Sequence, residues 1–185
     1  MTRFVETPIP GVLIVEPGVH RDGRGFFLET YREETYRGAG IRDRFVQDNL
    51  SSSVRNTLRG LHGQSPHAQA KLLQVVAGEI FDVAVDARRG SPRFGEHFAT
   101  RLSDRELHQI YLPAGVLHGF LVLSERAQVA YKCSDYYDPA AEFSVAWNDP
   151  ELAIAWPTDA PILSEKDRAA PRLREVAHRL IDYAR

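Results

Sequence analysis

The stretch LLQVVAGEIFDVAVDAR occupies residues 72–88 and decides the fold class of this chain. Within it, Phe81, Val83 and Val85 alternate with Asp82, Ala84 and Asp86, and strict alternation is typical of a half-buried β-strand. A Gly78–Glu79 pair interrupts the apolar run, so we expect two strands joined by a turn at this point.

Working outward from this stretch, further short apolar runs follow one another at intervals of about ten residues. They are HQIYLP (108–113), HGFLVLS (118–124) and AQVAYKCSDYY (127–137). Pro113, Gly115 and a polar turn at 124–126 separate them, and no long helical pattern interrupts residues 45–147. Many short strands with turn residues between them predict an all-β sandwich or jelly-roll barrel.

Helices are expected only at the periphery of this barrel. Residues 32–38 form a short helical pattern that Gly38 and Gly40 end. Ser164, with Asp167 three residues later, resembles a capping box. Apolar residues spaced as on one helical face predict an amphipathic helix at 172–183.

Length and composition place the chain among ordinary globular proteins. Its 185 residues predict a single domain, 1–185, and 43% apolar with 26% charged residues exclude a disordered chain. A net charge of −2 argues against a nucleic-acid partner. The single cysteine, Cys133, cannot form an intrachain disulfide, and no apolar run suits a signal peptide or a membrane span. We therefore expect a cytoplasmic protein without a membrane partner.

Seven histidines are candidates for chemistry, and two have unusual surroundings. The expectation for His20, His97, His108 and His178 is exposure to solvent, because their neighbours are polar. His62 lies in LRGLHGQ, whereas His118 begins a very apolar run. A polar ring in such a run must find a hydrogen-bond partner or face a cavity, so His118 is either a core histidine or a pocket residue.

The segment Pro113-x-Gly115-x-x-His118 resembles the second motif of the cupin superfamily of jelly-roll barrels. The first cupin motif supplies two histidines and a glutamate as metal ligands. Here the positions of the histidines fall at Ser65 and His67, and Lys71 stands where the glutamate is expected. An ammonium group repels a divalent metal. The pattern predicts a metal-free, cupin-like barrel in which Lys71 supplies the positive charge, unless Lys71 is a surface lysine.

Nine stretches, in order and over nearly the whole chain, resemble the dTDP-4-dehydrorhamnose 3,5-epimerase family of nucleotide-sugar enzymes. They are DGRGFFLETY (22–31), FVQDNLSSS (45–53), LRGLH (58–62), AQAKLLQVV (68–76), GEIFDVAVDARRGSPRFG (78–95), LPAGVLHGFLVLSE (112–125), YKCSDYYDP (131–139), WNDPELAIAWP (147–157) and LSEKDRAAP (163–171). Each motif alone is weak evidence for the family, whereas nine motifs in the family's order are specific to it.

The resemblance implies a set of catalytic residues. His62 matches the catalytic base and Asp167 its carboxylate partner, while Tyr131 matches the proton donor on the opposite face of the sugar. Lys71 matches the lysine beside the sugar oxygen, and Tyr137 matches the ring that stacks on thymine. Taken singly, Tyr131 or Tyr137 could instead be a strand aromatic packed in the core, which is the commoner fate of such a residue.

The resemblance also implies substrate-binding positions and a partner. The residues that match the lining of the substrate site are Gln47, Asn49, Arg59, His118, Glu142 and Lys166. Arg24, Phe27 and Glu29 match residues that the family lends to the neighbouring subunit, so a homodimer is implied. The implied substrate is a nucleotide-diphosphate sugar, dTDP-4-dehydro-6-deoxy-D-glucose, inverted at C3 and C5.

The chemistry of these residue types agrees with that activity. C–H bonds beside a 4-keto group are acidic, so epimerisation needs a base, an acid across the ring and a cation for the enolate oxygen. Histidine suits the base, a carboxylate fixes its tautomer, and lysine or arginine suits the enolate and the diphosphate. No cofactor is required.

One departure from the family pattern leaves the product open. An aromatic residue usually follows the catalytic histidine, whereas this chain has Gly63, which we expect to widen the sugar pocket or free the loop. A single-site epimerase acting at C3 or C5 of a related deoxysugar is therefore an alternative. A metal-dependent cupin enzyme is a remoter alternative, which the lysine at position 71 disfavours. A non-catalytic sugar-binding cupin is another, which the presence of His62, Tyr131 and Asp167 together disfavours.

Overall fold

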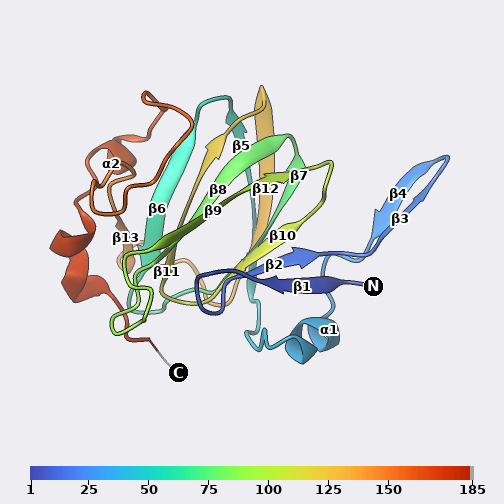
Figure 1. The fold of residues 1–185 in the computed structure, drawn as a ribbon, viewed down its shortest axis with the longest axis horizontal. Coiled ribbons are helices and arrows are strands. Elements are labelled where there is room, and N and C mark those ends of the chain that lie inside the picture. Colours follow the sequence, from blue (N-terminus) through green and yellow to red (C-terminus); the bar gives the residue numbers. More distant parts are fainter. Residues whose placement is uncertain (184–185) are drawn as a thin grey trace.

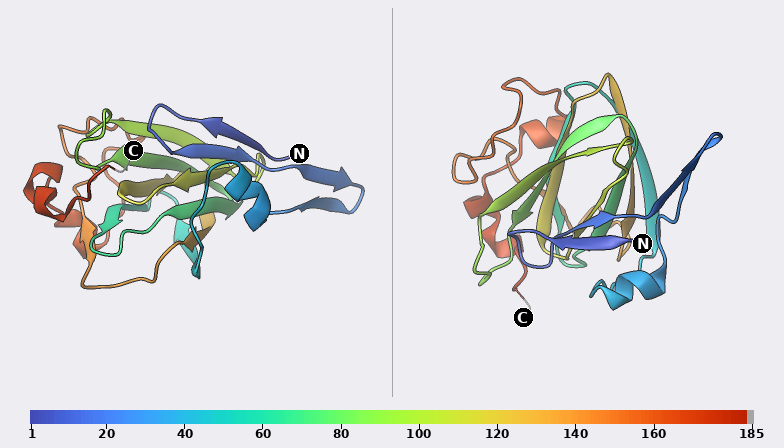
Figure 2. Two further views of the ribbon diagram at one scale, coloured as in Figure 1. Left: turned by 90° about the horizontal axis from the view of Figure 1, so that it is seen from below. Right: turned by 45° about the vertical axis from the view of Figure 1, so that its right-hand side comes forward.

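A computed structural model describes residues 1–183, and β-strands dominate them (Figure 1). Two large antiparallel sheets face each other, and a two-stranded hairpin projects from the body (Figures 1 and 2). The all-β, cupin-like jelly-roll architecture predicted from the strand pattern is confirmed.

The first sheet has six strands, which pair in the order β1-β2-β10-β7-β12-β5. Their bounds are β1 (Arg3–Glu6), β2 (Leu13–Glu16), β10 (Gln109–Leu112), β7 (Lys71–Ala77), β12 (Arg126–Cys133) and β5 (Gln47–Val54). The second sheet has five strands, in the order β13-β6-β11-β8-β9. Their bounds are β13 (Glu142–Ser144), β6 (Leu58–Gln64), β11 (Val116–Val122), β8 (Glu79–Asp86) and β9 (His97–Ser103).

The two strands predicted in 72–88 are present, but they belong to different sheets. β7 pairs with β10 and β12, whereas β8 pairs with β9 and β11. Gly78 makes the crossing at a φ of +84°, a conformation that side chains rarely adopt. The chain therefore passes from one wall of the barrel to the other within one residue, and the main core of apolar side chains lies between the walls.

The alternation in β8 is correct, but the strand is not half-buried. Phe81, Val83 and Val85 pack outside the barrel, against the second core under the C-terminal segment. Asp82 and Asp86, on the other face, are fully buried. Both faces are covered because the five-stranded sheet has the barrel interior on one side and the C-terminal segment on the other. Asp82 consequently lies inside the barrel.

The C-terminal segment contains two short helices, α2 (Glu165–Arg168) and η1 (Leu173–Arg179). Ser164 caps α2 by accepting the Asp167 backbone N–H at 3.1 Å, as predicted, but the Asp167 carboxylate turns to His62 instead of completing a capping box. The amphipathic helix predicted at 172–183 is wrong in type and length, since η1 is a 3-10 helix of seven residues. Leu173 and Val176 nevertheless bury their side chains as the apolar spacing indicated.

A third cluster covers part of the outer face of the six-stranded sheet. It includes Tyr36 from the predicted helix α1 (Glu33–Gly38), which packs on Val15 and Tyr111. The hairpin of β3 (Val19–Asp22) and β4 (Gly25–Leu28) precedes this helix and points away from the barrel (Figures 1 and 2). Among residues 1–183, no helix is both long and apolar enough to cross a membrane.

Candidate active site

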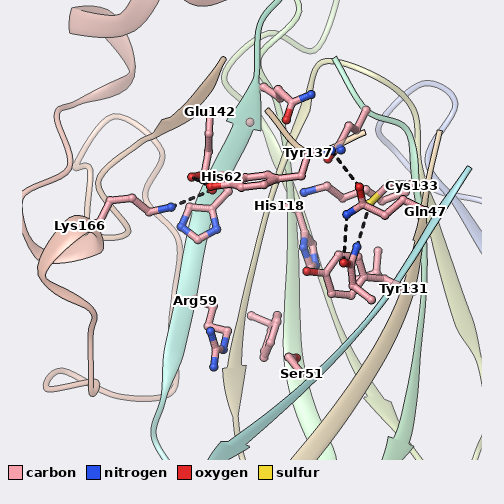
Figure 3. A pocket seen from close by; sticks show the side chains of 17 residues that line it. Gln47, Ser51, Arg59, His62, His118, Tyr131, Cys133, Tyr137, Glu142 and Lys166 are labelled. Carbon is pink, nitrogen blue, oxygen red and sulfur yellow. Dashed lines mark hydrogen bonds and ion pairs between the residues drawn. The ribbon is translucent and has the colours of Figure 1, made fainter. Parts of the chain in front are cut away.

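A cavity of about 380 Å³ lies between the two sheets. Its size is typical of small-molecule sites. Most of the predicted site residues line it, and Figure 3 shows their side chains converging from several strands. The predicted residues in this lining are Gln47, Asn49, Arg59, His62, Lys71, His118, Tyr131, Tyr137, Glu142 and Lys166.

His62 is paired with a buried carboxylate. Its Nε2 lies 2.6 Å from Asp167 Oδ1, and the exposed fractions of the two side chains are 24% and 3%. Burial opposes ionisation of Asp167, but the hydrogen bonds from the His62 ring and the Ser164 cap outweigh it and lower the pKa of the carboxyl. When Nε2–H donates to this carboxylate, Nδ1 remains free to accept a proton.

His118 has a second carboxylate partner inside the barrel. Its Nε2 lies 2.8 Å from Oδ2 of Asp82, which comes from the neighbouring strand β8. His118 and His62 are opposite each other across β11 and β6. The two possibilities left open by the sequence therefore both apply: His118 is a buried, hydrogen-bonded histidine, and it also lines the pocket.

A glycine allows β6 and β11 to approach closely beside these histidines. Gly60 has a φ of +127°, and a Cβ on it would lie 2.5 Å from the Gly119 Cα. A side chain at position 60 would therefore force the two strands apart. The register of the two strands shifts here, between His118 and Phe120, so the pairing of His62 with His118 depends on this contact.

Lys71 lies at the cavity wall and is not a surface lysine. Burial lowers the pKa of its ammonium group, while the nearby Cys133, Glu142 and Asp82 act in the opposite direction. Burial also raises the pKa of the Cys133 thiol, which accepts a 3.6 Å hydrogen bond from Asn49. A cation thus lies beside the cavity, where it can stabilise negative charge on a bound molecule.

Tyr131 and His62 belong to opposite sheets. Tyr131 is on β12 of the six-stranded sheet, and His62 is on β6 of the five-stranded sheet. Figure 3 shows the two side chains on different walls of the pocket. Burial raises the pKa of the Tyr131 phenol, so the group is protonated and available as a donor at neutral pH.

A polar array occupies one side of the cavity. Glu142 accepts a 2.9 Å hydrogen bond from the Tyr137 hydroxyl and forms a 2.8 Å ion pair with Lys166 (Figure 3). Although burial opposes ionisation, these two partners lower the pKa of Glu142. Gln47 accepts the Tyr137 backbone N–H at 2.9 Å. Tyr137 is 51% exposed, so a planar ligand can reach its ring.

Besides Asp167, which reaches the cavity only through its bond to His62, three predicted residues lie outside it. Arg24 and Phe27 are on or beside the projecting hairpin, and Glu29 follows it. Arg24 pairs with Asp22 at 2.6 Å, Glu29 pairs with Arg32 at 2.6 Å, and Phe27 is 71% exposed. The chain does not bring them to its own pocket.

Gly63 itself lines the cavity, but the first of the two expectations, that the missing side chain widens the sugar pocket, is wrong. A Cβ at this position would lie 2.8 Å from Phe143 Cζ and 2.7 Å from Leu117 Cδ2. Both side chains belong to the second core, outside the barrel, so the space beside Gly63 is already filled and lies behind His62.

The two remaining cupin positions have no ligand character here. His67 is largely exposed and lies 3.5 Å from Asp135, and the Ser65 backbone N–H donates to the Ala141 carbonyl.

Of the four histidines expected to be exposed to solvent, His20 and His178 are exposed, whereas His97 and His108 are partly buried.

The sequence did not predict every lining residue, Cys133 among them, nor did it predict Asp82, which binds His118 and does not itself line the cavity. Cys133 entered the sequence-based expectations only through disulfides, and Asp82 only as a member of the alternating strand at 81–88. The one available signal for Asp82 was an acidic residue in the middle of a strand rich in Val and Ala.

The pair of His62 and Asp167 can remove a proton from a bound molecule, and Tyr131 can return one from the opposite wall, with the partly buried Lys71 beside them. This is the chemistry of a cupin-like enzyme of the epimerase class. Sequence comparison identifies the family: the profile of dTDP-4-dehydrorhamnose 3,5-epimerase matches residues 6–175. The chain belongs to this family of isomerases.

Individual relatives agree with this assignment. The chain is 53% identical to a dTDP-4-dehydrorhamnose 3,5-epimerase from Pseudomonas aeruginosa, over 86% of this chain and 90% of that protein. A Legionella pneumophila 3,5-epimerase solved with dTDP-4-keto-L-rhamnose is 47% identical, with a TM-score of 0.97 over 100% of both chains. A 3′-monoepimerase from Streptomyces bikiniensis, solved with dTDP-quinovose, is 39% identical, with a TM-score of 0.90 over 97% of this chain and 93% of that one.

Proposed function

We propose that this enzyme inverts C3 and C5 of dTDP-4-dehydro-6-deoxy-D-glucose and so forms dTDP-4-dehydro-L-rhamnose. The observation that carries the proposal is the placement of His62, with its buried carboxylate, and Tyr131 on opposite sheets around one cavity that Lys71 also lines. Epimerisation needs a base and an acid on opposite faces of the sugar ring.

His62 acts as the base. With Nε2 bound to Asp167, Nδ1 removes the proton from the carbon beside the keto group, and the C–H electron pair moves into the enolate. Asp167 fixes the ring orientation and stabilises the imidazolium that forms. Lys71 supplies positive charge for the enolate oxygen from a site where little water screens it.

Tyr131 returns a proton from the other face. Its phenol donates to the carbanionic carbon, which inverts the centre, and solvent then restores the phenol proton. The residues around the sugar and diphosphate assist by binding: Arg59, Gln47, Asn49, His118, Glu142 and Lys166 line the same cavity. Tyr137 offers an exposed aromatic face for the thymine base.

The enzyme acts as a homodimer in which each copy completes the other's site. Two features of the surface support this part of the proposal. Phe26 and Phe27 are 52% and 71% exposed on the projecting hairpin (Figure 1). Leu50 and Val54 on β5, and Val76 on β7, are exposed on the six-stranded sheet, on either side of β12. Exposed apolar groups of this kind mark interaction sites, and Arg24, Phe27 and Glu29 would then reach the partner's cavity.

The proposed location is the cytoplasm, where nucleotide sugars are available. The free and buried thiol of Cys133 is compatible with a reducing compartment. Single-site epimerisation remains the alternative, because a monoepimerase is among the solved relatives.

Proton NMR in heavy water tests the proposed function. The purified protein is incubated with dTDP-4-dehydro-6-deoxy-D-glucose, and a following reductase traps the product for identification. We expect deuterium at both C3 and C5 and an L-rhamnose product. In the Tyr131→Phe variant, C3 wash-in is spared more than C5 inversion. Wash-in at only one carbon over many turnovers would identify a single-site epimerase, and full activity of a monomer would refute the shared site.

A further inference from the structure

The strand pair that carries His62 and Glu142 has an unusual packing arrangement on the face away from the cavity. Phe143 of β13 is opposite Gly63 of β6, with its ring where a side chain at position 63 would extend. Gly63 does not have a left-handed φ, so its backbone would accept any residue. Only the occupied space excludes a side chain, because a Cβ at position 63 would lie 2.8 and 3.0 Å from two carbons of the Phe143 ring and 2.7 Å from Leu117 Cδ2, the end of a flexible side chain.

Phe143 is held from the other side by Arg179, at the end of η1. The Arg179 guanidinium lies 5.4 Å from the ring centroid and donates to the Ala141 carbonyl at 2.7 Å and the Ser65 carbonyl at 3.2 Å. The three-residue strand β13 is therefore fixed to β6 by a stacked ring and by hydrogen bonds at its start.

Glu142, next to Phe143 in this strand, lines the active-site cavity. Glu142 binds Tyr137 and Lys166, and Ser144 is opposite His62 across the strand pair. Because successive side chains of a strand point to opposite faces, the seat of Phe143 on Gly63 determines where Glu142 lies in the cavity wall.

We propose that Phe143 is a positioning residue for this epimerase site. Its effect on catalysis rests on the proposed function. Its ring, seated on Gly63, holds Glu142 and His62 in a fixed relation. It follows that large side chains at positions 63 and 143 exclude each other, and that one can replace the other once the end of the Leu117 side chain turns aside.

A double-mutant cycle tests the proposal. The variants are Phe143→Gly, Gly63→Phe and the double exchange, with Phe81→Ala as the matched control. Phe81 packs in the same second core, against Trp156, and does not line the cavity. The measurements are dTDP affinity by calorimetry, amide hydrogen exchange of β6 and β13, and thermal stability.

We expect each single exchange to weaken dTDP binding on the order of 10-fold, as is usual for coupled neighbours, and to speed amide exchange in β13. The double exchange should recover most of both losses. Phe81→Ala should lower thermal stability and leave dTDP affinity and β13 exchange unchanged. For a single variant that does not fold, Phe143→Leu and Gly63→Ala replace it as milder changes of the same kind.

The proposal is overturned if Phe143→Gly or Phe143→Leu behaves like the control, with stability lost and dTDP affinity and β13 exchange retained. It is also overturned if the double exchange recovers nothing. Failure of the proposed function has a different signature: the wild type would show no deuterium wash-in or no dTDP binding, while the β13 exchange pattern across the cycle would still report on the positioning role.

Discussion

The cavity holds two histidine–carboxylate pairs that differ in how they are built. In the outer pair, His62 binds Asp167, which lies 105 residues further along the chain on the short helix α2. In the inner pair, His118 binds Asp82, which belongs to the adjacent strand of the same sheet. The outer histidine is 24% exposed, and the inner one 8%.

The difference indicates separate tasks. A base must meet substrate and exchange its proton with solvent, which the more exposed outer pair can do. The inner pair is fixed within a hydrogen-bonded sheet, and Asp82 Oδ1 has no hydrogen-bond partner among the described residues. Its carboxylate lies close enough to Lys71 to raise the pKa of that amine. We infer that the outer pair moves the proton and that the inner pair sets the charge and hydrogen bonding of the cavity floor.

The largest expected effect separates the two histidines. His62→Ala should slow deuterium wash-in at C3 and C5 by about 10²–10⁴-fold, because the general base is lost. His118→Ala, the matched change in the inner pair, should cost much less. NMR in heavy water measures both, and dTDP affinity should persist in His62→Ala. Equal losses in the two variants would mean that both pairs transfer protons.

A smaller effect is expected from the carboxylate of the outer pair. Asp167→Asn keeps the shape but removes the charge that stabilises the imidazolium and fixes its tautomer, so the rate should fall on the order of 10–100-fold. Steady-state kinetics with the reductase-coupled assay check this. Ser164→Ala, which removes the cap of α2 and one minor contribution to the lowered Asp167 pKa but keeps the carboxylate, is the control and should cost less. A wild-type rate in Asp167→Asn would make the outer carboxylate a structural group.

The inner pair should affect the pH dependence of kcat through Lys71. Lys71 must be protonated to stabilise the enolate, so activity is lost as the pH rises through its lowered pKa. The Asp82 charge opposes that lowering, so Asp82→Asn should move the alkaline limb of kcat to lower pH.

Two variants serve as references for this shift. Lys71→Arg should move the alkaline limb to higher pH, because guanidinium keeps its proton. Asp167→Asn should leave the limb in place, since Asp167 is not among the groups that affect the Lys71 pKa. An unchanged alkaline limb in Asp82→Asn would separate the inner pair from Lys71.

The smallest effect, none at all, is expected from chelators. Lys71 stands where a cupin metal site has a carboxylate, and its ammonium group would repel a divalent ion beside His118. Activity should be the same before and after dialysis against EDTA. Loss of activity that one divalent ion restores would show that the histidines of the two pairs bind metal.

The sequence by itself determined much of this protein. Strand alternation and turn residues gave the all-β class and most strand positions, since local periodicity depends on residues close in the chain. Residue types at family positions singled out the residues that line the cavity. The homodimer and the roles of Arg24, Phe27 and Glu29 stay predictions.

Only the tertiary structure decided which face of each strand is covered and by what. Alternation in β8 groups Phe81 with Val83 and Val85, but the barrel takes the other face inside, and with it Asp82. Gly63 gave no sign that the ring of Phe143 would occupy its space. The physical reason is that periodicity shows which side chains share a face, whereas the group opposite that face is set by strand order and register between segments distant in the chain.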